Sequence, residues 1–385
     1  MIKKVANNAT NQEPINLEPI EKIIEKLDYY RSLFQELTSL SQEELDILTL
    51  NIKTFFNIKP IVNVKTVPEY LFRISINNRI LEPNKLDFFT EIKYLLAPPI
   101  DKCNYNRCNI KGEQVIYCAT DELTAYWETK PEKGDVITIS KFKAKPNATL
   151  NSALIDYKRV KPNKYEHQYE EVFHILNEFF IEVFTMPIKR ENPINYIFSA
   201  ILSSEQLFYP IYYDQIIEAI IYPSVQRKMK GQNIALRNDL IFEKYDLIET
   251  TTRFIVEDYE NTDPHSNDIP FDDLIASITI KDFDFENGKI IYPIEFEDKF
   301  ELFRYLQQLD KKQMRFINEE DSDEFLKNLK FEKAQNSKQI LEKKYNRNDR
   351  ITVLYYNNGP VKKSIKYKLV EQDLKDKKCM ILKNE

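Results

Sequence analysis

Apolar residues recur at three- and four-residue spacing over the first sixty positions, as in helices that bury one face. The first such series is Ile20, Ile23, Ile24, Leu27, Phe34 and Leu37. Ser41 followed by Glu44 has the spacing of a capping box and predicts the start of a second helix. Residues 1–66 are therefore predicted to form a polar arm and a helical hairpin, which covers a core or binds a partner.

The pattern then changes to alternation, which is typical of strands with one buried face. Strands are predicted at residues 70–76, 114–119, 136–142 and 216–222. Helical spacing returns at residues 169–183, before Pro187, and again at residues 196–207. Residues 67–240 are therefore predicted to form a mixed core of strands and helices.

Beyond residue 240 the alternation resumes and predicts a β-rich extension over residues 241–385. Asn287-Gly288 and Asn358-Gly359 each lie between alternating runs, as hairpin turns do. A helix is expected at residues 300–309, an acidic loop at residues 258–268 and a charged bend at residues 319–324. The fold class predicted from the whole pattern is α+β.

Composition narrows the class of protein. The chain has 385 residues, of which 42% are hydrophobic and 30% charged, which is enough for a substantial core. It holds no apolar run of membrane-spanning length, and its first residues do not resemble a signal peptide. Its four cysteines form neither CxxC pairs nor an export-linked disulfide framework. We expect a cytoplasmic protein with reduced cysteines that does not enter a membrane.

Charge and histidine content argue against two kinds of site. With 61 acidic and 55 basic residues the net charge is −6, which disfavours nucleic acid as the main partner. Residues 341–385 hold 12 Lys and Arg against 6 Asp and Glu, but no aromatic stacking platform accompanies them, so a solvated sheet face is favoured. Three scattered histidines make a metal site unexpected.

Polar residues are concentrated where the predicted strands begin or end. Arg107 lies in the turn before one strand, and Thr120 or Asp121 can cap the short helix after it. Glu128 ends that helix. Ser224 follows a later strand, with Asn233 expected in the loop beyond it. Binding and catalytic residues commonly occupy such positions.

Together these segments resemble the RES family, bacterial NAD-degrading toxins whose fold is related to ADP-ribosyltransferases. The resemblance covers about residues 70–237 and is carried by four ordered pieces: Leu-Phe-Arg73, Asn-Arg107-x-Asn-x-x-Gly112, Tyr117-x-Ala-x-x-x-x-x-Ala125-x-x-Glu128, and Tyr222-Pro-Ser224 with Gly231-x-Asn233. The chain departs from the family by having Asn106 in place of a glycine and Cys108 in place of an aromatic residue. The change at Cys108 is expected to alter how a base ring is held.

The resemblance implies a site that acts on NAD. It assigns catalytic roles to Arg73, Tyr117, Glu128 and Ser224, and substrate contacts to Arg73, Arg107, Tyr117 and Asn233. Guanidinium groups bind pyrophosphate through paired hydrogen bonds, and a carboxylate stabilises the positive charge that develops on the ribose. Ser224 would hold the nicotinamide amide or orient the acceptor. Without the resemblance, Arg73 would be assigned to a half-exposed strand surface and Tyr117 to the core.

The function predicted from the sequence is cleavage of the nicotinamide–ribose bond of NAD, with water or inorganic phosphate as acceptor. NAD is then a substrate, and no cofactor or metal is expected. Such an enzyme would act as a toxin or abortive-infection effector, with an antitoxin or immunity protein as partner and a homodimer through the N-terminal helices. The alternatives are an ADP-ribosyltransferase that modifies a macromolecule and a non-catalytic nucleotide-binding regulatory module.

Overall fold

The structure, a computed structural model, divides the chain into two compact units, Met1–Asn318 and Glu319–Glu385. The described residues are 18–56, 62–65, 67–81, 88–155, 170–188, 191–209, 217–255, 277–293, 347–355, 361–376 and 378–382. The boundary predicted at residue 240 lies inside the first unit, because strands on either side of it belong to one sheet. Among the described residues, no helix is long and apolar enough to cross a membrane.

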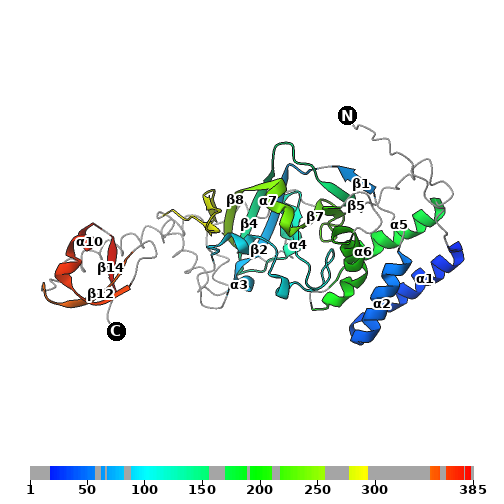
Figure 1. Ribbon diagram of the computed structural model, residues 1–385, viewed down its shortest axis with the longest axis horizontal. Coiled ribbons are helices and arrows are strands. Elements are labelled where there is room, and N and C mark those ends of the chain that lie inside the picture. The colour runs from blue at the N-terminus through cyan, green and yellow to red at the C-terminus, as the bar shows by residue number, and fades with distance from the viewer. Residues whose placement is uncertain are drawn as a thin grey trace. The chain divides into compact units, whose positions relative to one another are not determined.

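A nine-stranded mixed sheet forms the centre of the first unit (Figure 1), with the strand order β1-β5-β6-β7-β3-β2-β4-β8-β9. The strands are β1 (Val62–Lys65), β2 (Tyr70–Ile76), β3 (Val115–Ala119), β4 (Val136–Ala144), β5 (Asn151–Leu154), β6 (Ala219–Pro223), β7 (Gln232–Arg237), β8 (Tyr245–Phe254) and β9 (Ser277–Ile280). β5 and β6 are parallel, and the other neighbours are antiparallel. The α+β class is confirmed, and so are the four predicted strands.

The sheet consists of two halves that meet at one point. β2 pairs with β4 along its whole length and β3 pairs with β7 along its whole length. β2 and β3 pair with each other only at Phe72 and Ala119. Beyond that pair the two strands separate, and we call the space between residues 73–76 and 115–118 the fork.

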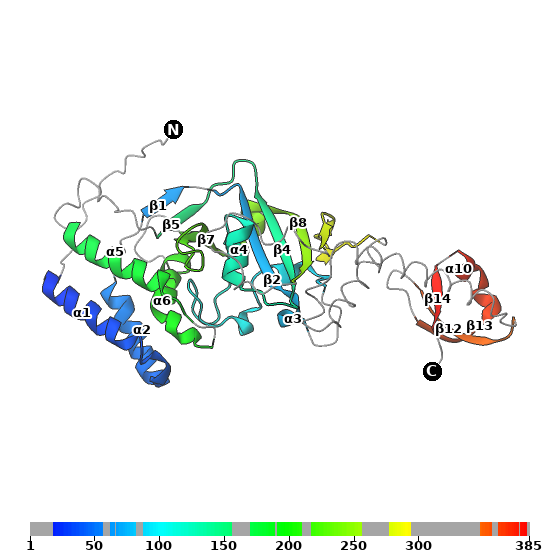
Figure 2. The same cartoon turned by 180° about the vertical axis from the view of Figure 1, so that it is seen from behind.

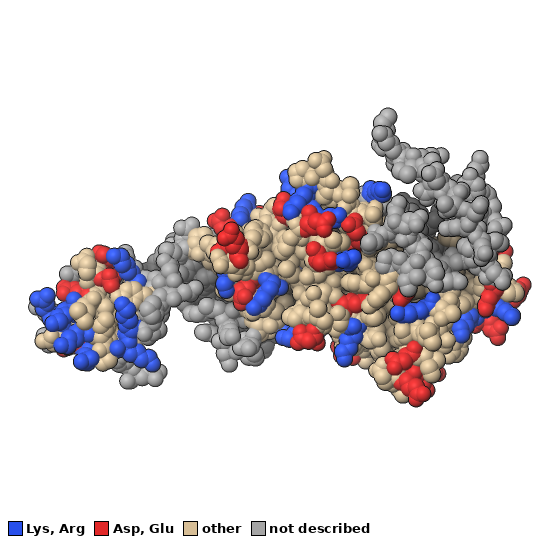
Figure 3. Space-filling view, viewed as in Figure 1, with Lys and Arg blue, Asp and Glu red and all other residues tan. Residues whose placement is uncertain are grey.

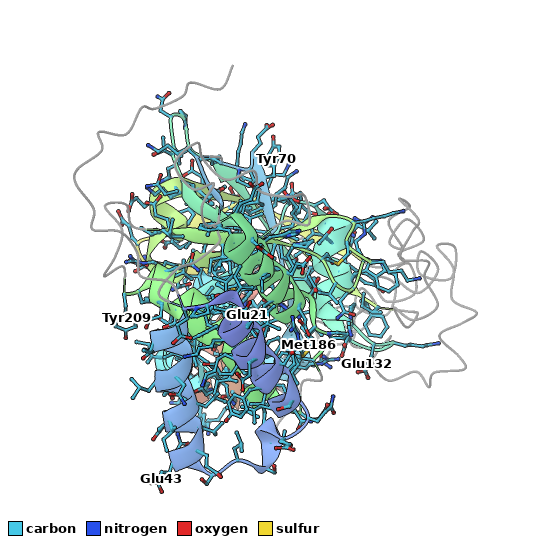
Figure 4. All side chains as sticks on the ribbon, turned by 90° about the vertical axis from the view of Figure 1, so that its right-hand side faces the viewer. Glu21, Glu43, Tyr70, Glu132, Met186 and Tyr209 are labelled. Carbon is cyan, nitrogen blue, oxygen red and sulfur yellow. The ribbon has the colours of Figure 1, made fainter. Side chains whose placement is uncertain are left out.

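Four helices form a layer over the β1-β5-β6-β7-β3 half of the sheet, and Figures 1 and 2 show them together from opposite sides. This helix layer consists of α1 (Ile20–Leu33), α2 (Gln42–Phe55), α5 (Glu170–Thr185) and α6 (Ile197–Leu207). Figure 4 looks onto its outer side, where Glu21 marks α1 and Glu43 marks the first turn of α2. The predicted capping box of α2 is present, and the predictions of these four helices are confirmed.

Aromatic rings hold the helix layer together. Tyr30 of α1, Phe56 after α2, Phe179 of α5 and Phe198 of α6 are each at most 1% exposed. The Phe56 and Phe179 rings stack with their centroids 5.4 Å apart, and the Tyr30 and Phe198 rings meet edge to face at the same centroid distance. The N-terminal hairpin therefore forms part of the core of the first unit.

The helix α4 (Glu122–Thr129) packs against the other half of the sheet. Its Tyr126 and Trp127 lie in a cluster with Ile74 and Ile76 of β2 and with Ile137 of β4. The alternation predicts one face for Tyr70, Phe72, Ile74 and Ile76, and the last two are buried as expected, but Leu71 and Ser75 on the other face are buried as well. Short helices at α3 (Asn77–Ile80) and α7 (Ile241–Lys244) complete the framework.

The predicted hairpins have different outcomes. Around Asn287-Gly288, β10 (Phe283–Asp284) and β11 (Lys289–Ile290) pair antiparallel, as predicted. Asn358-Gly359 lies outside the described residues, although the strands flanking it do pair. The predicted helix, acidic loop and charged bend at residues 300–309, 258–268 and 319–324 also lie outside them, as does the N-terminal arm.

The second unit holds a three-stranded antiparallel sheet. β12 (Arg350–Tyr355) lies between β13 (Val361–Lys366) and β14 (Cys379–Leu382), and α10 (Glu371–Lys375) packs beside them. Lys and Arg outnumber Asp and Glu on the face of this unit seen in Figure 3. This agrees with the basic composition of residues 341–385, and the solvated sheet face stays a prediction.

Candidate functional site

A cleft of about 1610 Å³ opens in the first unit at the fork between β2 and β3. Five of the six predicted site residues line it: Arg73, Arg107, Tyr117, Glu128 and Asn233. The sixth, Ser224, is fully buried and bonded to Glu128. Pockets for drug-sized molecules are roughly 300–1,000 Å³, so this cleft has room for a larger ligand such as a dinucleotide.

Glu128 is carried into the cleft by the last turn of α4. Asp121 caps the first turn by accepting a hydrogen bond from the Thr124 N–H at 2.8 Å, and Lys130 ends the helix in a left-handed conformation. The C-terminal end of a helix is the negative end of its dipole, so the dipole does not stabilise a carboxylate there. Other groups must stabilise the Glu128 carboxylate.

Two side chains donate to the same oxygen of Glu128. The Ser224 hydroxyl donates to Oε1 at 2.6 Å, and the Asn233 amide donates to it at 2.8 Å. No group among the described residues donates a hydrogen bond to Oε2. One carboxylate oxygen is therefore fixed while the other is available to a ligand.

The turn that supplies Ser224 is fastened to α4. Its ends are joined by the Ser224 N–H, which donates to the Gly231 carbonyl at 3.2 Å. Gly231 has a φ of +76°, and a Cβ there would lie 2.0 Å from Thr124 Oγ1. Only glycine permits this close approach. Asn233, expected in a loop, lies instead on β7, where its pairing with Tyr222 and Ala119 fixes its position.

Arg73 spans the fork. It donates from Nη1 to the Tyr117 carbonyl at 3.0 Å and from Nη2 to the Leu96 carbonyl at 3.2 Å. Its Nε is buried without a hydrogen-bond partner, and no carboxylate of the described residues forms an ion pair with it. Burial lowers the pKa of this guanidinium from its ordinary value, although arginine remains charged in proteins. A buried cation without a counter-charge favours an anionic ligand.

Arg107 has a different environment, although it lines the same cleft. It donates from Nη1 to the Phe184 carbonyl at 2.5 Å and from Nη2 to the Met186 carbonyl at 3.1 Å. These carbonyls belong to the end of α5, marked by Met186 in Figure 4, and they lack partners within the helix. Arg107 thus caps α5 and has its charge offset by the negative end of a helix dipole.

Tyr117 ties together the turn that carries Arg107. Its hydroxyl accepts a hydrogen bond from the Cys108 N–H at 2.8 Å and donates to Asn109 Oδ1 at 2.7 Å. Burial raises the pKa of Tyr117 well above its ordinary value, so the phenol stays protonated. Its ring lines the cleft, while its hydroxyl holds the turn.

Cys108 does not face the cleft. Its side chain is fully buried in the core of the helix layer, and burial raises the pKa of its thiol to about 12. An aromatic residue at this position would enter the core. The expectation that Cys108 alters the grip on a base ring therefore does not hold for this geometry.

Sequence reasoning missed the aromatic residues that line the cleft outside the motifs. Tyr196 ends a short 3-10 helix (Pro193–Tyr196), and Tyr105 precedes the turn of Arg107. Neither has a local sequence signal, because what brings them to the cleft is the packing of α5 and α6.

All four cysteines are free and buried. In the described ranges, no group of three or more His, Cys, Asp or Glu side chains is placed to bind a metal.

No family model matches the sequence, and no curated protein matches it.

Proposed function

We propose that this protein cleaves the nicotinamide–ribose bond of NAD and that its cleft is a RES-like active site on an ADP-ribosyltransferase-related fold. The observation that carries the proposal is the presence in one cleft of Glu128, whose Oε2 is available, and of Arg73, a cation without a carboxylate partner among the described residues. The four sequence pieces that resemble the family lie far apart in the chain, and their site residues meet at this cleft.

The charges suit the reaction. NAD carries a pyrophosphate, for which Arg73 supplies a cation without a counter-charge. When the N-glycosidic bond breaks, its electron pair passes to the ring nitrogen, so the cationic pyridinium leaves as neutral nicotinamide. Positive charge then develops on the ribose, where a carboxylate stabilises the transition state more than the ground state. Glu128 Oε2 would face this charge.

Ser224 and Asn233 position the carboxylate in this scheme. By donating to Oε1 they fix the rotation of the Glu128 side chain and leave Oε2 directed to the ligand. The acceptor forms the new C1′–O bond: water loses a proton and gives ADP-ribose, whereas phosphate gives a phosphorylated ADP-ribose. A strong general acid is not required, because the leaving group departs neutral.

The test is a time course of NAD with the purified full chain, with and without phosphate, followed by mass spectrometry. We expect release of nicotinamide together with ADP-ribose or its phosphate. Glu128→Gln, which keeps the side-chain shape, should lower the rate by about 100- to 1,000-fold, as loss of a transition-state charge contact does. Glu25→Gln, on the exposed side of α1, serves as the matched control and should behave as wild type.

Two results would overturn the proposal. Intact NAD in both reactions, under conditions where a known NAD hydrolase works, would remove the activity. Full turnover by Glu128→Gln would remove the assigned site. Label transferred from NAD to a protein or nucleic acid would instead identify an ADP-ribosyltransferase.

The proposed biological role is a toxin or abortive-infection effector that depletes NAD in the host cell. Induced expression in bacteria should lower cellular NAD and stop growth, and Glu128→Gln should do neither. Normal growth with undiminished NAD during wild-type expression would contradict this role. An antitoxin or immunity protein would be recovered as a factor that restores growth.

A further inference from the structure

Tyr196 is a cleft residue to which nothing above gives a role. It ends the 3-10 helix before α6, its side chain is half-buried, and it lines the cleft with Arg107 and Tyr222. The Arg107 guanidinium carbon lies 5.1 Å from the centroid of the Tyr196 ring and 5.9 Å from that of Tyr222. A cation at such distances is attracted to the ring face, so Arg107 holds the Tyr196 ring in place.

Arg107 is itself fixed. Its guanidinium donates to carbonyls at the end of α5, and the residue is only 7% exposed. Among the described residues Arg107 forms no ion pair, but the three carbonyls of Val183, Phe184 and Met186 offset its charge. Arg73 also donates to two carbonyls, but these are not at a helix end, and its Nε has no partner. The two guanidinium groups are therefore suited to different tasks.

We infer that Tyr196 is a stacking platform for a heteroaromatic ring of the ligand, that Arg107 is a positioning residue that holds this platform, and that Arg73 receives the anionic group. This inference rests on the proposed function, since NAD supplies two such rings and a pyrophosphate. Stacking on tyrosine recognises the π-face of a base and is tolerant of its identity. Adenine and nicotinamide share that chemistry, and the experiment separates them.

The location of Cys108 supports the assignment of the stacking platform to a residue outside the 106–112 turn. Because its side chain lies in the core, the 106–112 turn presents no aromatic ring to the cleft from position 108. Tyr117 is committed through its hydroxyl to Cys108 and Asn109. Tyr196 lines the cleft, and the Arg107 guanidinium lies over one face of its ring, so a ligand ring would stack on the other face.

The experiment measures equilibrium binding to the full chain by calorimetry with three probes: adenosine, nicotinamide riboside and inorganic pyrophosphate. The variants are Tyr196→Phe, Tyr196→Leu, Arg107→Met, Arg107→Lys and Arg73→Met. Tyr209→Leu, which removes a 50% exposed tyrosine that does not line the cleft, is the matched control. Thermal unfolding of each variant identifies those that fail to fold.

Tyr196→Leu should weaken binding of at least one nucleoside by roughly 5- to 150-fold, the range of base–aromatic stacking, and leave pyrophosphate binding unchanged. Tyr196→Phe should bind as wild type, because the ring face is kept. Arg107→Met should reproduce the nucleoside loss with pyrophosphate binding retained, and Arg107→Lys should recover only part of it. Arg73→Met should show the reverse selectivity. A merely structural defect would weaken all three probes together.

Three results would overturn the inference: nucleoside binding by Tyr196→Leu equal to wild type, a selective loss of pyrophosphate in Arg107→Met, or no nucleoside binding by the wild type. If Arg107→Met does not fold, the inference is tested by Arg107→Lys together with the two variants Tyr196→Phe and Tyr196→Leu. If NAD stays intact but nucleoside binding depends on Tyr196, the proposed reaction is rejected and the role of Tyr196 as a stacking platform is retained. If NAD is cleaved but nucleoside binding does not depend on Tyr196, the proposed reaction is retained and the stacking platform is rejected.

Discussion

The helix layer and the cleft each contain a buried polar atom without a hydrogen-bond partner, and the side chains that carry the two atoms differ in charge and surroundings. In the layer, the Tyr30 hydroxyl has no partner among the described residues and is surrounded by rings such as Phe55 and Phe198. At the cleft, the atom is Arg73 Nε. Both atoms are buried, but the first belongs to a neutral side chain enclosed in the core, whereas the second belongs to a cation whose side chain lines a large cleft.

This difference shows which unpaired groups point to a ligand. An unpaired neutral hydroxyl in a core reduces stability by a modest amount and needs no partner molecule. An unpaired cation costs more, and next to a cavity an anion can satisfy it. A buried polar atom without a hydrogen-bond partner is thus insufficient evidence for a ligand site. It becomes informative when its side chain is charged and lines a cleft.

Two carboxylates give the same comparison. Glu113 accepts at both oxygens, from the Ser204 hydroxyl at 2.6 Å and from the Ile110 N–H at 3.0 Å, and so ties the turn of Arg107 to α6. Glu128 accepts at one oxygen only. The fully satisfied carboxylate has a structural role, and the half-satisfied one is available for chemistry.

The largest expected effect is in the helix layer. Phe56→Ala removes a ring that is 1% exposed and stacked on Phe179, so the free energy of unfolding should fall by about 3–5 kcal/mol. Urea denaturation measures it, with Phe285→Ala as the control because Phe285 is 54% exposed. An equal effect of the two variants would mean that the ring cluster does not hold the layer.

The next effect is in the cleft. Ser224→Ala removes one of the two donors to Glu128 Oε1, and hydrogen bonds to charged groups are worth about 1.5–3 kcal/mol. If this hydrogen-bond energy stabilises the transition state, its loss should lower the rate of NAD cleavage by about 10- to 150-fold. Steady-state kinetics on Ser224→Ala and on Ser32→Ala, in the exposed part of α1, provide the comparison. An unchanged rate constant would show that Oε1 does not need this donor.

A smaller effect separates the two unpaired atoms directly. Tyr30→Phe removes the buried hydroxyl and keeps the ring, so the free energy of unfolding should rise by about 1 kcal/mol without any change in pyrophosphate binding. Chemical denaturation and calorimetry measure the two quantities.

Arg73→Met is the partner experiment. Its stability should fall, because the Tyr117 and Leu96 carbonyls lose their donor across the fork, and pyrophosphate binding should be lost as well. Loss of binding in both variants, or in neither, would abolish the distinction between the two regions.

Local signals predicted much of the framework. The spacing of Ser41 and Glu44 identified the cap of α2, and Asp121 proved to be the cap of α4, because cap chemistry acts within one turn. The alternation over 70–76 predicted the bounds of β2 but not the burial of Leu71 and Ser75 on its other face. The short strands β1 and β5 were missed, since four residues give too little alternation to identify a strand.

The environment of each site residue could not be predicted in this way. Asn233 was expected in a loop because a turn signal at Gly231 precedes it, but pairing with two neighbouring strands overrides that signal. Arg107 interacts with backbone carbonyls, which have no sequence signature. The sequence therefore assigned the same substrate-binding role to Arg73 and Arg107, although their environments differ. The separation of β2 from β3 is equally non-local.

The smallest expected effect is a dependence of stability on pH that comes from Glu113. Burial, only partly offset by the hydrogen bond from Ser204, raises the pKa of this carboxyl in the folded protein. Between the unfolded pKa of about 4.3 and the raised folded pKa, the folded state binds more protons, so this contribution to stability falls as pH rises.

Glu113→Gln has no proton to exchange at this position. The stability of the wild type relative to Glu113→Gln should therefore be greatest below pH of about 4, decline as pH rises through the folded pKa, and then stay constant. Urea denaturation of both proteins across this range measures the difference and cancels the titration of other groups. A difference that increases with pH would mean that the hydrogen bonds from Ser204 and Ile110 outweigh burial. Glu113 would then be a carboxylate whose surroundings stabilise its charged form, which would weaken its contrast with Glu128.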